Sequence, residues 1–254
     1  MLIDTHSHIY STEFIGDRDE VIQRAYSNDV RKIILPNIDS SSVKNMLDLV
    51  DTYPHICIPL MGLHPTSVNN DYQEELQLVE YWLKKRKFYG IGEIGIDLYW
   101  NTSFLEEQTN AFRFQLELAH QYKLPVVIHV RDSFDEVYNV LVQEKDKNLT
   151  GVFHSFTGTY EQAQLIIELG FKIGVGGIVT FKKSGLDQII SKIDPSHLIL
   201  ETDSPYLTPV PFRGKRNESS YLVYIAQKIA DLHQMTVGDI AKITTENARK
   251  LFGI

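Results

Sequence analysis

Cysteine is nearly absent from this sequence of 254 residues, since Cys57 is the only one. A single thiol excludes an intrachain disulfide and any metal site built from cysteines alone. It suits a reducing compartment, and we expect a cytoplasmic protein. No apolar run approaches the roughly 18 residues that a membrane-spanning helix needs. The N-terminus also lacks the basic and then apolar segments of a signal peptide.

Basic residues are also in deficit. The chain has 25 Lys and Arg against 33 Asp and Glu, which gives a formal net charge of −8 at pH 7. This balance argues against a protein that coats duplex DNA with a broad basic surface, although it allows a nuclease with a small cleft. No linker, low-complexity segment or shift in composition divides the chain. We therefore expect a single domain over residues 1–254.

Eight short apolar segments recur along the chain. Most are continuous apolar runs rather than alternations, which is typical of parallel strands buried on both faces. The predicted strands are Leu2–Thr5, Lys32–Ile38, Ile56–Gly62, Tyr89–Ile94, Val126–Val130, Gly151–His154, Phe171–Val175 and Leu198–Glu201.

The segments between these strands have apolar residues at helical spacing. Strand followed by helix, repeated along the chain, predicts an α/β fold of the (β/α)8 TIM-barrel type, with the active site at the C-terminal ends of the strands. The long segment 204–220 follows the last strand and should lie over that face. The predicted helices are Asp17–Asn28, Ser42–Val50, Tyr72–Lys85, Phe104–Tyr122, Asp135–Val142, Tyr160–Leu169, Tyr221–Leu232 and Thr236–Phe252.

Seven side chains that could bind a metal or substrate fall at the predicted C-terminal strand ends. Residues two apart on a strand point the same way, so both imidazoles of the first His-Ser-His motif should face the barrel mouth. Neutral imidazoles suit a borderline metal such as zinc. The seven residues are His6, His8, His64, Glu93, His129, His154 and Asp203.

These residues are sufficient for two metal ions. His129 and His154 come from adjacent strands and could form a second imidazole pair. Glu93 has two oxygens and could bridge two ions, and Asp203 could bind one ion and hydrogen-bond its water. Four imidazoles and two carboxylates leave open coordination positions on two metals, as catalytic sites do.

Each of these residues taken alone also fits a structural role. His64 could shape a turn before Pro65, Glu93 could be a capping or ion-paired carboxylate, and Asp203 could be an ordinary turn residue. As a set, however, they would be half-buried without partners in a barrel that bound no metal, which is costly. The other four histidines fit packing or solvent contact: His55, His120, His197 and His233.

Ordered motifs along the whole chain resemble the TatD family of metal-dependent deoxyribonucleases, within the amidohydrolase superfamily. The match includes every position at which we expect a ligand. The motifs are Ile3-Asp4-Thr5-His6-Ser7-His8, Gly62-Leu63-His64-Pro65, Gly90-Ile91-Gly92-Glu93-Ile94-Gly95-Ile96-Asp97, Pro125-Val126-Val127-Ile128-His129-Val130-Arg131, Phe153-His154-Ser155-Phe156-Thr157-Gly158, Glu201-Thr202-Asp203-Ser204-Pro205-Tyr206-Leu207, Arg213-Gly214-Lys215-Arg216-Asn217-Glu218 and Glu246-Asn247-Ala248.

The resemblance implies a (β/α)8 barrel with a divalent metal centre that hydrolyses phosphodiester bonds, typically in DNA. By position, His6, His8 and Asp203 would hold one ion, His129 and His154 would hold the second, and Glu93 would bridge them. The ions would be Zn²⁺, Mg²⁺ or Mn²⁺. A metal-held water or hydroxide would attack phosphorus, with Asp203 also acting as general base.

Basic and aromatic side chains near the mouth are candidates for substrate contacts. Arg131 and Arg213 could hold phosphate oxygens. Tyr206 could stack on a base, as could Tyr99 and Trp100. Further basic residues follow strands seven and eight: Lys182, Lys183, Lys215 and Arg216.

We expect His64 to contact a substrate oxygen or the leaving group. The resulting hypothesis is a monomeric exonuclease acting on single-stranded DNA or strand ends, with no membrane partner. Two alternatives stay open. One is an amidohydrolase or lactonase with a small carbonyl substrate, although strand four lacks the lysine that bridges the metals in many such relatives. The other is a non-catalytic metal-binding barrel.

Overall fold

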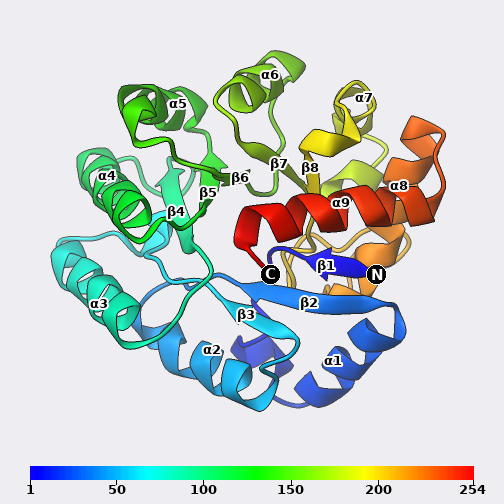
Figure 1. Ribbon diagram of the computed structural model, residues 1–254, viewed down its shortest axis with the longest axis horizontal. Coiled ribbons are helices and arrows are strands. Elements are labelled where there is room, and N and C mark those ends of the chain that lie inside the picture. The colour runs from blue at the N-terminus through cyan, green and yellow to red at the C-terminus, as the bar shows by residue number, and fades with distance from the viewer.

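The computed structural model describes all 254 residues, and its eight parallel strands form a closed barrel surrounded by helices (Figure 1). The predicted (β/α)8 fold is therefore confirmed. The strands are β1 Leu2–Asp4, β2 Val30–Leu35, β3 Cys57–Pro59, β4 Ile91–Asp97, β5 Val126–Arg131, β6 Gly151–Phe153, β7 Lys172–Val175 and β8 Leu198–Leu200.

Two short bridges close the ring of strands. Strands β1, β2 and β3 pair in that order, and β4 to β8 pair in sequence order. Ser7 pairs with Ser204 and so joins the segments that follow β1 and β8, while Met61 pairs with Ile91 and joins the β3 side to β4. Most strand residues are buried, as expected for strands with the barrel interior on one face and helices on the other.

Nine helices surround the barrel or cross one of its ends, and none of them is long and apolar enough to cross a membrane. They are α1 Arg18–Ser27, α2 Ser40–Thr52, α3 Tyr72–Lys85, α4 Leu105–Tyr122, α5 Phe134–Gln143, α6 Tyr160–Glu168, α7 Leu186–Ile190, α8 Leu222–His233 and α9 Val237–Phe252. Side-chain caps fix the start of several of them. Thr159, for example, accepts from the Gln162 amide and forms a capping box at α6.

Helix α7 is the element that the sequence patterns did not predict. It has five residues and begins after Gly185, which lies in the left-handed region at φ 72°. A helix of little more than one turn buries only Leu186 and Ile190, so it lacks the repeated spacing that identifies longer helices. Two helices follow β8 instead, as predicted.

Helix α9 closes the end of the barrel at which the strands begin and lies across the ring in Figure 1. Thr245 donates to the carbonyl of Met1, just before β1, and Asn247 donates to the carbonyl of Leu198 at the start of β8. Ala248 and Phe252 pack against apolar side chains from the strands inside the barrel. The opposite end, where the strands finish, is left for the site.

Candidate metal centre

Several predicted ligands lie beyond the strand ends rather than on them. Strand β1 ends at Asp4, so His6 and His8 lie in the segment that follows it. His64 lies well past the end of β3 and precedes a 3-10 turn over Pro65–Ser67. Asp203 follows β8 in the left-handed region, at φ 57°. Because β1, β3 and β8 are short, the segments that follow them carry these side chains over the barrel mouth.

The sequence predicted that Glu93 lies at the end of a strand, but the structure places it inside β4. The pairing of β4 with β5 shifts register between Ile91 and Ile94, which is the signature of a bulge. A bulge here bends the strand and changes the direction in which the Glu93 side chain points. Two residues later, a side chain at Gly95 would place its Cβ 2.1 Å from the carbonyl oxygen of His129, so only glycine allows β4 to approach β5 this closely.

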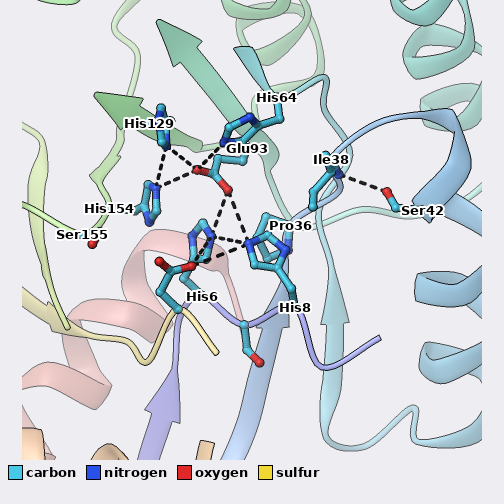
Figure 2. Close-up of polar contacts among 12 residues, drawn as sticks. His6, His8, Pro36, Ile38, Ser42, His64, Glu93, His129, His154 and Ser155 are labelled. Carbon is cyan, nitrogen blue, oxygen red and sulfur yellow. Dashed lines mark hydrogen bonds and ion pairs between the residues drawn. The ribbon is translucent and has the colours of Figure 1, made fainter. Parts of the chain in front are cut away.

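Glu93 lies between two sets of imidazoles (Figure 2). Its Oε1 is 2.7 Å from Nε2 of His154 and 2.8 Å from Nδ1 of His129. Its Oε2 is 3.0 Å from Nε2 of His6 and 3.6 Å from Nε2 of His8. One oxygen therefore faces each set, which is the arrangement that a carboxylate bridging two ions requires.

The first candidate ion position lies among His6, His8 and Asp203, whose ligand atoms lie within 4.8 Å of one another. Oδ1 of Asp203 is 3.8 Å from Nε2 of His6 and 3.7 Å from Nε2 of His8. The two Nε2 atoms are 3.1 Å apart. Zinc–ligand bonds of about 2.0–2.1 Å place tetrahedral ligand atoms about 3.3 Å apart, so this spacing suits one ion.

The second candidate position lies beside Oε1 of Glu93. Nδ1 of His129 and Nε2 of His154 are 3.3 Å apart and both face this oxygen. His64 lies here too, with its Nε2 3.1 Å from the same oxygen. The trios His6–Glu93–His154 and His64–Glu93–His129 each meet the spacing for a metal. The geometry thus brings all seven predicted residues together. It also places His64 close enough to Glu93 and His129 to share an ion with them.

Burial and mutual contact control the charges in this cluster. Burial and the neighbouring His6 hold the pKa of His8 well below its usual range. Burial works to raise the pKa of Glu93, but the surrounding imidazoles outweigh it and hold that pKa well below the usual value. Burial also works to lower the pKa of His129, and hydrogen bonds to Asp97 and Glu93 raise it to about 9.

Asp203 differs from Glu93, because burial raises its pKa to about 7 when no ion is bound. The raised value has a simple cause: the partners of Asp203 lie 3.7 Å or more away, too far for hydrogen bonds that would offset desolvation.

The donor set fits divalent metal ions. Imidazole nitrogens and carboxylate oxygens are ligands for zinc and related metals. Glu93 is 2% exposed and needs positive charge nearby, because a buried carboxylate without a counter-charge is strongly disfavoured. Without ions, part of that charge comes from His129, whose raised pKa keeps it protonated at pH 7, whereas neutral imidazoles such as His8 offer only lone pairs. Cations between the two sets would satisfy both requirements.

A cavity of about 610 Å³ opens over this cluster. Arg131, Tyr206 and His64 line it, as does Trp100, so these candidates for substrate contact face the ion positions. Arg131 is the only Lys or Arg in the lining, and its guanidinium contacts an aromatic ring rather than a carboxylate. Its guanidinium lies 3.8 Å from the ring centroid of Tyr99.

The other basic candidates lie elsewhere. Arg213 stacks on Phe181, 4.1 Å from the ring centroid, and does not line the cavity. Arg216 is bound to Asp17 at 2.6 Å, so its charge is already paired. The segment 204–220 carries Tyr206 over the mouth as expected, but turns these guanidinium groups away from it.

Two buried carboxylates behind the histidines escaped the sequence reasoning. Asp97, at the end of β4, contacts Nε2 of His129 at 2.9 Å. Glu201 accepts from the Ser155 amide and lies 3.7 Å from Nδ1 of His154. Spacing could have revealed Asp97, since it lies four residues after Glu93 on one strand and so faces the same side.

Comparisons with known proteins agree with this geometry. The model of the family described as "TatD related DNase" matches residues 3–253. An "uncharacterized metal-dependent hydrolase YabD" of Bacillus subtilis is 38% identical over 255 residues, covering all of both chains. The crystal structure of YjjV, a TatD homolog from Escherichia coli, superposes with a TM-score of 0.93 at 31% identity, over 100% of this chain and 98% of that one.

A more distant solved structure shares the fold alone. A lactonase from Listeria monocytogenes superposes with a TM-score of 0.70 at 14% identity, over 99% of this chain and 94% of that one. At this identity the likeness places both chains in the same barrel architecture and carries nothing about substrate.

Proposed function

The chain belongs to the TatD-related DNase family of metal-dependent hydrolases, and from this premise we propose that it hydrolyses phosphodiester bonds in DNA. The observation that carries the proposal is Glu93, whose two oxygens face two separate imidazole sets at the floor of an open cavity. Paired ion positions of this kind suit the in-line displacement of a phosphoryl group.

We propose that His6, His8 and Asp203 hold one divalent ion and that His129 and His154 hold the second. Glu93 would bridge the two. Zn²⁺, Mg²⁺ and Mn²⁺ are the candidate metals. Bound there, two such ions would lower the pKa of a water and offset the charge that develops on the phosphoryl oxygens.

The chain's own residues supply the other roles. One oxygen of Asp203 faces His6 and His8, and the carboxylate also lines the cavity, so it can accept a proton from the attacking water. Arg131, unpaired and held against Tyr99, would bind a phosphate oxygen. His64 would contact the substrate or the leaving oxygen.

Exposed aromatic rings at the mouth favour unpaired bases as the substrate. Trp100 is 69% exposed and follows β4, and Tyr206 is 53% exposed and follows β8, on the opposite side of the ring of eight strands. Bases of a single strand stack on such rings, whereas those of a duplex are already stacked on one another. We therefore propose action on single strands or strand ends, as an exonuclease.

A turnover panel tests the proposal. The metal-reconstituted protein would be given a fluorescent single-stranded DNA, the matching duplex, an RNA of the same sequence and a set of small esters and lactones. Cleavage of the single-stranded DNA that stops on chelation would support the proposal. Turnover of a lactone or ester with intact DNA would contradict it and favour the small-carbonyl alternative.

Other expectations from the sequence stay predictions. They are the cytoplasmic location, the monomeric state and the single domain over residues 1–254. The same panel tests the non-catalytic alternative, because retained metal with no turnover of any of these substrates would favour a metal-binding barrel.

A further inference from the structure

The two ring nitrogens of His129 face different carboxylates. Nδ1 faces the ion position, 2.8 Å from Oε1 of Glu93 and 3.3 Å from Nε2 of His154. Nε2 points the other way and lies 2.9 Å from Oδ2 of Asp97. Asp97 is 2% exposed and contacts no lysine or arginine.

Asp97 is fixed in place on every side. Its Oδ1 accepts the backbone N–H groups of Tyr99 at 3.0 Å and Trp100 at 3.3 Å. Its own backbone is clamped by the buried side chain of Gln108, which accepts from the Asp97 amide at 2.8 Å and donates to its carbonyl at 3.1 Å. Both carboxylate oxygens therefore act as acceptors.

An acceptor at Oδ2 requires a proton on Nε2 of His129. We propose that Asp97 is a positioning residue that keeps this proton on Nε2, so that Nδ1 is the nitrogen left to bind the second ion. Histidine ligands in general depend on such a partner to fix the ring and its tautomer. The inference rests on the proposed ion position between His129 and His154 and requires no particular substrate.

His8 has a corresponding partner at the first ion position. The hydroxyl of the buried Tyr10 donates to the carbonyl of Pro36 at 2.5 Å. Its oxygen must then accept from Nδ1 of His8, which lies 2.9 Å away. Nε2 of His8 is thereby left without a proton and faces Glu93 and Asp203.

An asparagine at position 97 could not replace the carboxylate. It has one oxygen acceptor, whereas Asp97 serves His129 with one oxygen and two backbone amides with the other. If the amide oxygen kept the contacts with Tyr99 and Trp100, its NH₂ group would donate to Nε2 and move the ring proton to Nδ1. An amide that stabilises the wrong tautomer of a functional histidine disables it with little change in geometry.

Substituting Asp97 and Tyr10 in turn tests whether each one supports a different ion position. Zn²⁺ would be titrated by calorimetry into the wild-type protein, Asp97→Asn and Tyr10→Phe, with melting curves to check the fold. We expect Asp97→Asn to weaken one of two zinc sites by about 10–100-fold and to leave the other within about threefold. Tyr10→Phe should weaken the other site instead.

A second measurement assigns the nitrogens and needs no variant. Long-range ¹⁵N–¹H spectra of the zinc-loaded wild-type protein should show His129 bound through Nδ1 with its proton on Nε2. Zinc on Nε2 of His129 would overturn the inference even if Asp97→Asn failed to fold. So would unchanged zinc affinities in a folded Asp97→Asn, or loss of the same site in both variants. A wild-type protein that bound none of Zn²⁺, Mn²⁺ and Mg²⁺ at His129 would instead contradict the second ion position of the proposed function.

Discussion

Replacing Asp203 with asparagine separates catalysis from stability at this site. The substitution keeps the size of the side chain and a carbonyl that could still contact an ion, but the amide cannot accept a proton from water. General-base assistance contributes about 10²–10⁴ in rate, or about 3–5 kcal/mol of transition-state stabilisation. We expect turnover at saturating metal to fall by about that factor, with the ion at His129 and His154 retained.

The same substitution should stabilise the protein when its ions are removed. The carboxyl of Asp203 has a pKa of 3.8 in the unfolded chain and about 7 in the fold, because burial disfavours its charge. Folding thus favours the protonated form, and wild-type stability falls as the pH rises from about 4 to about 7. A difference of about 3 pKa units corresponds to up to about 4 kcal/mol. Asp203→Asn, which has no charge to bury, should exceed the wild type at pH 8 and match it near pH 4.

The assay combines rate, metal content and denaturant unfolding. Unfolding would be followed with chelator present at pH 4 and pH 8, and turnover at saturating metal. Asp135→Asn is the matched control, because Asp135 is an exposed carboxylate in a neighbouring cavity of about 430 Å³ and contacts no candidate ligand. A rate for Asp203→Asn within about threefold of wild type would refute the base role. Equal stabilities at pH 8 would refute the burial argument, and a variant without metal at saturating concentration would show that Asp203 acts chiefly as a ligand.

Four further predictions concern the metal centre, the substrate and the buried thiol. His64→Ala should keep its metal content by elemental analysis and lose turnover; loss of an ion would make His64 a ligand. Chelation should abolish turnover, and up to two divalent ions per chain should restore it, so full activity without metal would contradict the site. Oligonucleotide affinity measured from 50 to 200 mM salt should fall far less than the roughly 10³–10⁵-fold of proteins with six to ten phosphate contacts. Cys57, 1% exposed with a pKa raised by burial to about 12, should resist iodoacetamide in the folded protein; rapid labelling seen by mass spectrometry would contradict its burial.

Sequence patterns were sufficient for the strands and for most helices, because the physical cause of each is local. A run such as Val126–Ile128 is apolar on both faces, as a parallel barrel strand requires where the barrel interior covers one face and helices cover the other. Helix α7 was not predicted for the converse reason, since its five residues are too few to show a helical periodicity. Glu93 was placed at a strand end, but it lies inside β4, because a bulge depends on the pairing of two strands and leaves no pattern in one of them.

The ligand types could be predicted, while the partners that orient them could not. His8 and His129 are recognisable because imidazoles near strand ends are uncommon without a function. Tyr10 and Asp97 acquire their roles only through distances of 2.9 Å to particular ring nitrogens. A tyrosine two residues past a histidine has no such meaning until its hydroxyl is seen to donate to Pro36.

The charge of the cavity explains how an acidic chain could act on an acidic polymer. Its lining holds the carboxylates Glu93, Asp97 and Asp203 against Arg131 and, without ions, a protonated His129, so it carries a net negative charge and would repel a phosphodiester. Two divalent ions would change that charge to about +2 and place the positive charge where the phosphoryl oxygens bind. Affinity and catalysis would then depend on the same ions, and the protein would need no basic surface of its own. That dependence is why chelation should remove oligonucleotide binding together with turnover, whereas a substitution of Arg131 should weaken binding and leave the metal content unchanged.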